Sequence, residues 1–383
     1  MQKKIIALAI VAAFSAPAFA DTNVYGVVDA AVVRASGDGV QGGIQAVSGG
    51  LATSRLGVKH TEVLDGGLTA VVVVEYKLDT ETNSSILAAR QQMLALAGDF
   101  GTVATGYLQT AGYDFGSKYD VLAGSTLSPL QDITNGQLFT IGAVAGASRA
   151  PRALAYISPN MGGLVVAVNY TTSFKGDLGN VASANTAAAG GTTATLLSVN
   201  YETGPFSVGA VLLNTVNDAA GNNGGLTAAN NALLAAPLAG SAANVKEYAL
   251  GASYDLGVAK IKATYQDLTM PNIGFSYDNK VYSVGVAAPV GPGTVVASYA
   301  KSSIGLDTTG NSDASGYGVA YLQGMSKTTT AYVGYSATTQ GTAINGVSVL
   351  NDAMGGNITT ATPSQMKLGG GSSVIAFGLN KKF

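Results

Sequence analysis

The chain lacks several residue types that soluble proteins usually carry. Its 383 residues include no cysteine, no tryptophan and a single histidine, His60. Asp, Glu, Lys and Arg together make up 11% of the chain, whereas a soluble domain usually carries about 25%. So few charges would leave a soluble protein of this size poorly hydrated. Without disulfides the fold must be held by other means, which suits one large continuous sheet.

Long hydrophobic runs are also missing. Outside the N-terminus, no run approaches the roughly 18 to 20 apolar residues of a membrane-spanning helix, so a helical membrane protein is excluded. The 51 glycines follow no three-residue period, which excludes collagen. The high content of Val, Leu, Ile and Tyr disfavours disorder.

The first twenty residues predict a signal peptide. Lys3 and Lys4 precede an apolar stretch from Ile5 to Phe14, and Ala18-Phe19-Ala20 forms a small-x-small end. We therefore expect cleavage after Ala20. An N-terminal anchor is the alternative, but the apolar stretch is too short to span a bilayer. Removing the two lysines makes the net charge more negative than the −2 of the whole chain, which gives no basis for binding nucleic acid.

Alternation of apolar and polar residues at period two dominates the rest of the chain. In its clearest segment Ala259, Ile261, Ala263 and Tyr265 alternate with polar residues, two of them lysines. Such alternation predicts half-buried strands. Sixteen are expected, at 22–35, 51–62, 68–78, 85–97, 102–109, 149–158, 164–174, 193–203, 206–215, 245–256, 258–267, 280–289, 293–302, 315–325, 327–338 and 372–383.

Two architectures fit these strands: a soluble sandwich and an outer-membrane barrel. Three features favour an all-β, 16-stranded antiparallel transmembrane β-barrel. The apolar faces carry small and medium side chains, tyrosines recur near strand ends, and short connections alternate with long ones. An even number of strands lets the sheet close without a free edge, and sixteen strands leave an aqueous channel.

Several motifs give the mature chain, residues 21–383, a family resemblance. They are Val24-Tyr25-Gly26-Val27-Val28-Asp29-Ala30, Ser54-Arg55-Leu56-Gly57-Val58-Lys59, Gly98-Asp99-Phe100-Gly101-Thr102-Val103, Ser158-Pro159-Asn160-Met161-Gly162-Gly163 and the terminal Phe383. In this order, after a signal peptide, they resemble the general porins of Gram-negative bacteria, especially those of the beta-proteobacterial type.

The resemblance implies a homotrimeric, water-filled diffusion channel in the bacterial outer membrane, without a cofactor. Its partners would be outer-membrane lipid and lipopolysaccharide, together with the barrel-assembly machinery, which would read Phe383 as part of its signal. The third external loop would fold into the lumen, and residues 110–148 match that loop by position. A loop of that length normally has a function.

The candidate transport residues are arginines and aspartates. All five arginines, Arg34, Arg55, Arg90, Arg149 and Arg152, lie in the first 152 residues. Alternation places Arg55 and Arg90 on the lumen side, because charge that faces lipid is costly. The loop carries Asp114, Asp120 and Asp132. We predict a constriction with arginines on the wall and aspartates on the loop, and a weak preference for anions.

Other functions have less support. The single histidine leaves no basis for a Ser-His-Asp arrangement or a His/Cys metal site, so we expect neither an enzyme nor a metal protein. Two alternatives remain open: a secreted or surface β-rich adhesin, and a substrate-specific channel on the same barrel.

Overall fold

The computed structural model describes residues 20–37, 43–81, 88–133, 148–172, 193–216, 244–269, 277–306, 312–340 and 370–383. The predicted signal peptide lies outside these residues except for Ala20, and so do residues 134–147 of the predicted constriction loop. The first strand begins at Asp21, directly after the predicted cleavage site.

Seventeen strands in the described residues form one antiparallel sheet. They are β1 (Asp21–Gly37), β2 (Gly43–Ser48), β3 (Arg55–Val63), β4 (Thr69–Lys77), β5 (Ala89–Gly98), β6 (Gly101–Gln109), β7 (Arg149–Ile157), β8 (Leu164–Thr171), β9 (Thr193–Thr203), β10 (Phe206–Val216), β11 (Lys246–Asp255), β12 (Lys260–Thr269), β13 (Tyr277–Val290), β14 (Gly293–Leu306), β15 (Ser312–Gly324), β16 (Thr329–Gln340) and β17 (Gly371–Lys382).

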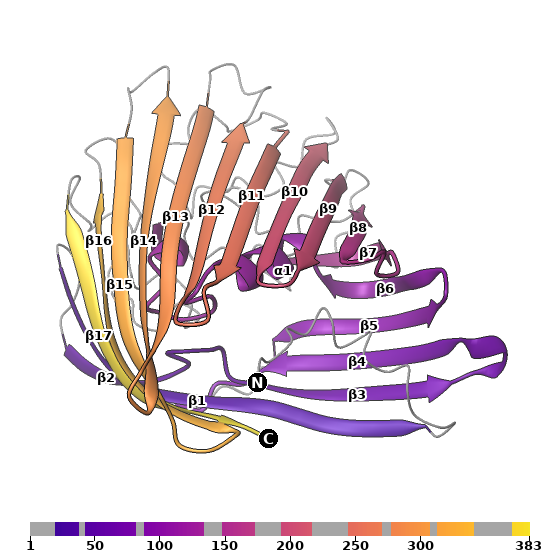
Figure 1. Cartoon of the computed structure of the whole chain (residues 1–383), viewed down its shortest axis with the longest axis horizontal. Coiled ribbons are helices and arrows are strands. Elements are labelled where there is room, and N and C mark those ends of the chain that lie inside the picture. Colours follow the sequence, from indigo (N-terminus) through magenta and orange to yellow (C-terminus); the bar gives the residue numbers. More distant parts are fainter. Residues whose placement is uncertain are drawn as a thin grey trace.

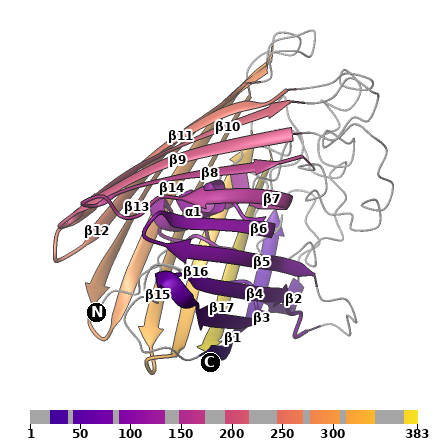
Figure 2. The same ribbon diagram turned by 90° about the vertical axis from the view of Figure 1, so that its right-hand side faces the viewer.

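The sheet closes on itself because β1 pairs with β17 on one side and with both β2 and β3 on the other. β2 pairs with the C-terminal part of β1 (Ala30–Ala35), and β3 pairs with its N-terminal part (Asp21–Val27). The two strands therefore fill one strand position in the ring. The closed barrel therefore has the sixteen strand positions that the sequence predicts (Figure 1). Figure 2 shows β8, β9, β10 and β11 side by side in a strongly tilted wall.

Each of the sixteen predicted strands corresponds to an observed one, with ends that differ by a few residues. The prediction misses β2, because it treats residues 36–50 as a loop. Residues 49–54, which we call the inner turn, separate β2 from β3 along the chain, and those two strands pair with different parts of β1.

Large apolar side chains are exposed on the outer face of many strands around the ring. Leu94, Leu154, Leu212, Leu250 and Phe377, on five different strands, are each about half exposed. A soluble protein rarely exposes so continuous an apolar surface. It fits a barrel in contact with lipid, and it disfavours the soluble adhesin.

Among the residues that the structure describes, three short helices interrupt the strand pattern: η3 (Asp65–Gly67), α1 (Ala111–Tyr119) and α2 (Pro129–Ile133). No helix in the described part of the chain is long and apolar enough to cross a membrane. We call residues 110–133 the inner segment. It lies inside the ring, where α1 contacts β8 to β12 and α2 contacts β14 to β16 (Figure 1).

Glycines on the inner face make room for the inner segment. Tyr119 covers Gly251, and Leu127 covers Gly334. A methyl group at either glycine would overlap the side chain above it. Small residues in the wall thus let the inner segment lie directly on the strands.

Candidate pore constriction

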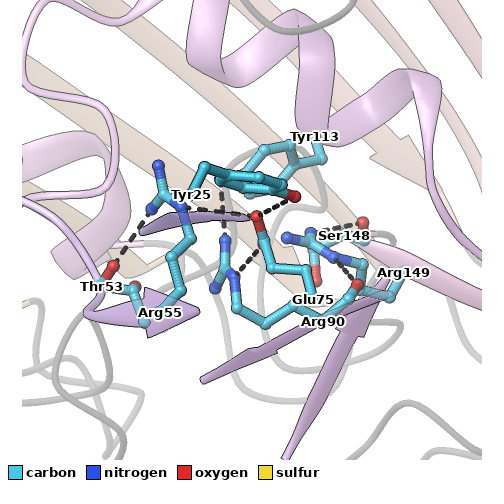
Figure 3. Close-up of polar contacts among 8 residues, drawn as sticks. All are labelled: Tyr25, Thr53, Arg55, Glu75, Arg90, Tyr113, Ser148 and Arg149. Carbon is cyan, nitrogen blue, oxygen red and sulfur yellow. Dashed lines mark hydrogen bonds and ion pairs between the residues drawn. The ribbon is translucent and has the colours of Figure 1, made fainter. Parts of the chain in front are cut away.

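Three of the five arginines converge inside the barrel. Arg55 begins β3, Arg90 lies in β5 and Arg149 begins β7. We call these three residues the arginine group; Figure 3 shows them around Glu75 of β4. Because β3, β4 and β5 are neighbours in the sheet, adjacent strands bring together residues that lie far apart in the sequence.

Glu75 holds two of these guanidinium groups. Its Oε1 accepts a hydrogen bond from Arg90 Nε at 2.7 Å, and its Oε2 lies 3.6 Å from Arg55 Nε. Tyr25 donates its hydroxyl to Oε2 at 3.0 Å. Arg55 also donates to the carbonyl of Thr53 at 3.1 Å. One carboxylate among three guanidinium groups leaves this part of the wall cationic.

A β-bulge explains the orientation of Arg90. Glu75 pairs with Gln91 and Tyr76 with Ala89, so Arg90 has no partner in the ladder between β4 and β5. An extra residue of this kind re-aims a side chain. The prediction put Arg90 inside by counting from Ala89, yet Leu94 further along β5 faces outward. Arg90 shares its parity with Leu94, so the bulge is what makes it point inward.

The inner segment brings an aromatic ring to the arginine group. The guanidinium of Arg149 lies 4.1 Å from the ring centre of Tyr113, within the range of a cation–π contact. Arg90 Nη2 donates to the Tyr113 hydroxyl at 3.4 Å, and Arg149 Nε donates to the carbonyl of Arg90 at 2.6 Å (Figure 3). Burial alone would raise the pKa of Tyr113, but the nearby arginines lower it to about 8.

Of the three predicted aspartates, Asp114 lies nearest to the arginine group. Its Oδ1 accepts a hydrogen bond from Gln109 Nε2 at 2.5 Å. Burial raises the pKa of Asp114 to about 6, although Gln109, Arg149 and Lys118 each favour the ionised form. Asp114 therefore offers a carboxyl that interacts with the charge of Arg149, and its place in the constriction stays a prediction.

Asp120 and Asp132 are used differently. Asp120 accepts hydrogen bonds from the Ser128 hydroxyl at 2.5 Å and from the Leu122 backbone at 3.0 Å. Asp132 accepts one from Ser336 of β16 at 3.0 Å. Both carboxylates are buried, and burial raises their pKa values. The structure therefore uses them to hold the inner segment in place and does not set them opposite the arginine group.

The remaining two arginines, Arg34 and Arg152, are both exposed. Arg34 is exposed, and its ladder partners Ile375 and Ile44 are also exposed, whereas Val33 and Ala35 beside it are buried. Its expected place in the constriction is therefore wrong: this position in β1 points outward. Arg152 is exposed and has a left-handed backbone, φ 48°. It lies where the β6–β7 register shifts, and its place in the constriction stays a prediction.

A second polar cluster was not predicted. The buried carboxylate of Asp29 accepts hydrogen bonds from Tyr332 of β16 at 2.6 Å, Asn380 of β17 at 2.7 Å and the Ala52 backbone at 3.1 Å. It thus links both ends of the chain to the inner turn. Gly50 in that turn accepts hydrogen bonds from the inner segment. Asp29 stands in the quoted N-terminal motif, which was the only available signal for this role.

Phe383 closes the chain against β1. Its backbone exchanges two hydrogen bonds with Gly26, at 3.0 and 3.2 Å, and its ring covers the same glycine. His60 lies on β3 opposite Thr22, whose hydroxyl is 2.8 Å from the His60 Nδ1. Among the described residues no three His, Asp or Glu side chains are grouped as a metal ion would need.

A family model described as Gram-negative porin matches residues 7–343. The outer membrane porin protein 32 of Delftia acidovorans is 30% identical over 300 residues, which cover 76% of this chain and 77% of that protein.

Solved structures agree on the fold. The anion-selective porin from Comamonas acidovorans superposes with a TM-score of 0.75 at 23% identity, over 95% of this chain and all of that one. A trimer form of OmpT from Vibrio cholerae gives a TM-score of 0.63 at 15% identity, over 95% of this chain and 99% of that one.

Proposed function

The chain belongs to the family of Gram-negative porins and forms a passive channel across the outer membrane, and we propose that the arginine group is its charged constriction. Ions and small hydrophilic solutes pass down their concentration gradients, with a weak preference for anions. No cofactor takes part.

The observation that carries this proposal is the set of three inward guanidinium groups around one carboxylate, faced by the inner segment. Fixed charges lining a narrow aqueous passage raise the local concentration of ions of opposite sign. Glu75 pairs with Arg55 and Arg90 and offsets part of their charge, and Asp114 adds a second carboxyl nearby. This partial compensation supports a weak rather than a strong preference. The anion selectivity named for the Comamonas porin supports the same sign.

Reversal potentials across a salt gradient in planar bilayers test the proposal. We expect a weak anion preference that disappears when Arg55, Arg90 and Arg149 are all replaced by Gln. Arg34→Gln is the matched control, because it removes the same charge from the outer face. A clear cation preference of the unmodified channel, or an equal effect of Arg34→Gln, would overturn the proposal.

The route to the membrane is also part of the proposal. Residues 1–20 are a signal peptide removed on export, Phe383 belongs to the signal that the barrel-assembly machinery reads, and the channel works as a homotrimer among lipopolysaccharide and other lipids. Native mass spectrometry tests the removal of the signal peptide through the mass of the mature chain, and the homotrimer through the mass of the assembly. Deletion of Phe383 should lower the amount of folded barrel in outer membranes.

A further inference from the structure

Tyr113 brings the inner segment into direct contact with the arginine group. It lies in the first turn of α1, where its backbone amide donates to the side-chain oxygen of Thr110 at 3.3 Å. Thr110 is itself fully buried, so the start of the helix is held in place. The ring of Tyr113 meets Arg149 of β7, and its hydroxyl meets Arg90 of β5 (Figure 3). This side chain therefore joins two strands of the wall to the inner segment.

Both contacts of Tyr113 favour a negative charge on its phenol. The guanidinium of Arg149 lies 4.1 Å from the ring centre, and Arg90 Nη2 donates to the hydroxyl oxygen at 3.4 Å. A nearby positive charge and a hydrogen bond donated to the ionisable oxygen each stabilise the ionised form. The first turn of a helix adds the positive end of the helix dipole. The surroundings of Tyr113 thus suit a phenol that can lose its proton.

The aspartates of the inner segment make different contacts. Asp120 and Asp132 accept hydrogen bonds from serine hydroxyls, and Asp114 accepts one from Gln109. Tyr113, in contrast, contacts two of the three guanidinium groups. The inner segment therefore meets the arginine group with a phenol, a group that is neutral or negative according to the pH.

We propose that Tyr113 is a specificity-determining residue of the channel: its phenol faces two guanidinium groups, and loss of its proton cancels one positive charge of the constriction and lowers the preference for anions. The inference rests on the proposed function, which assigns the constriction to the arginine group. A neutral phenol leaves the guanidinium charges in place, whereas a phenolate is a fixed anion in contact with two of them. Fixed charges beside a narrow aqueous passage bias the choice of ion.

The charges around Tyr113 determine how much one phenolate changes. The titratable groups next to it on the wall and on α1 are Tyr25 of β1, Arg55 of β3, Glu75 of β4, Arg90 of β5, Arg149 of β7 and Asp114 of α1. With Glu75 and Asp114 ionised, the three guanidinium groups leave one net positive charge, and a phenolate at Tyr113 cancels it. Lys118, further along α1, is already paired with Glu202 of β9 at 2.7 Å.

The direction of the pH effect follows from the state of the phenol. The pKa of Tyr113 is about 8, because the nearby arginines outweigh the effect of burial. The phenol is therefore mostly neutral at pH 7 and mostly ionised at pH 9, and the anion preference falls as the pH rises through 8. Asp114, with a pKa of about 6, is already mostly ionised at pH 7. Its titration therefore precedes that of Tyr113.

Reversal potentials of the full protein in planar bilayers, across a potassium chloride gradient at pH 7 to pH 9, test the proposal. We expect the chloride-to-potassium permeability ratio to fall about two- to fivefold over this range, as for one charge beside the passage. Tyr113→Phe keeps the ring over Arg149 and removes the ionisable hydroxyl, so the fall should be absent. Tyr25→Phe is the matched control, because it removes a hydroxyl of the same site that donates to Glu75, and the fall should persist.

The phenolate can also be observed directly, through its absorbance at longer wavelength than the phenol. The difference between the unmodified protein and Tyr113→Phe, titrated in detergent, should show one phenolate that forms around pH 8. An equal fall of the permeability ratio in Tyr113→Phe, or no such phenolate up to pH 9, would overturn the inference. An anion preference that stays constant from pH 7 to pH 9 refutes the role of Tyr113 alone, whereas an unmodified channel without anion preference at pH 7 refutes the proposed function.

Discussion

Glu75 is the residue on which the geometry of the arginine group depends. It binds Arg90 directly, lies near Arg55 and accepts the hydroxyl of Tyr25. Its carboxylate keeps two guanidinium groups in fixed positions and cancels part of their charge. Under the proposed role of the arginine group, selectivity therefore reflects a balance of opposite charges and not the number of arginines alone.

Glu75→Gln should raise the preference for anions. The amide keeps an acceptor for Arg90 but removes the negative charge, and a charge interaction of about 1 kcal/mol corresponds to a several-fold change in an equilibrium. We expect the anion-to-cation permeability ratio, taken from reversal potentials, to rise about two- to fivefold. Glu62→Gln, an exposed position of β3 on the face of Leu56 and Val58, is the control. A lower ratio for Glu75→Gln would contradict the role assigned to Glu75.

Asp114 should make selectivity depend on pH. Its pKa is about 6, so the carboxyl is neutral at pH 5 and negative at pH 7. The added negative charge near Arg149 opposes the arginines, and the anion preference should fall as pH rises through 6. Reversal potentials measured between pH 5 and 7 would show this. Asp114→Asn should remove the dependence, and persistence of the same slope in that variant would refute it.

At the scale of elements, the inner segment is held by packing as well as by hydrogen bonds. Leu127 is fully buried in an apolar cluster with Leu122, Val33 and Val374. Tyr119 and Phe115 belong to a second cluster against β9 to β11. The segment therefore has two apolar anchors, one within α1 and one between α1 and α2.

Leu127→Ala should weaken the apolar anchor that contains Leu122 and Leu127. Truncation of a buried leucine costs about 2–5 kcal/mol, because it loses apolar contacts and leaves a cavity. We expect a lower thermal midpoint by circular dichroism in detergent and noisier open-channel current. Leu94→Ala removes the same atoms from the half-exposed outer face. If the inner segment contributes nothing to stability, Leu127→Ala and Leu94→Ala should have nearly the same thermal midpoint.

Local pattern predicted the strands but not the exceptions to the pattern. Alternation identifies sixteen strands because each has one apolar and one polar face. It cannot locate the bulge at Arg90, since an extra residue inverts the parity that the count relies on. The inner turn was missed for a related reason: its contacts with Asp29 and with the inner segment join positions that no local window contains.

The same limit applies to the candidate site. The inward orientation of Arg55 was predicted from the alternation within β3, and the ladders of that strand contain no bulge. Arg34 was assigned to the constriction by residue type, and its parity in β1 points it outward. The buried partners of Asp120 and Asp132 are Ser128 and Ser336. These contacts depend on the path of the inner segment across the wall, which local residue patterns cannot predict.

At the scale of the whole molecule, Asp29 connects the seam of the barrel with its interior. It lies on β1 and binds side chains of β16 and β17, the last two strands of the chain. It also binds the inner turn, on which the inner segment rests. The closure of the ring and the position of the inner segment therefore share one buried carboxylate.

Asp29→Ala should destabilise the barrel. It leaves the Tyr332 hydroxyl and the Asn380 amide buried without their acceptor, at about 1–3 kcal/mol each. We expect a lower thermal midpoint and a smaller fraction of heat-modifiable folded protein on gels. Asp65→Ala, at an exposed turn, is the control. Equal midpoints for both variants would show that the Asp29 cluster is dispensable.

The contacts of the inner segment with the barrel wall also determine when that segment can take its final position during folding. Many of its contacts lie on strands from β8 to β16, which follow it in the chain, and the contacts of Asp29 join residues 303 and 351 positions apart. Contacts so distant in sequence form late, because long loops must close first. A barrel that is still being assembled therefore has no defined aperture. The channel reaches its final width only after β17 has paired with β1.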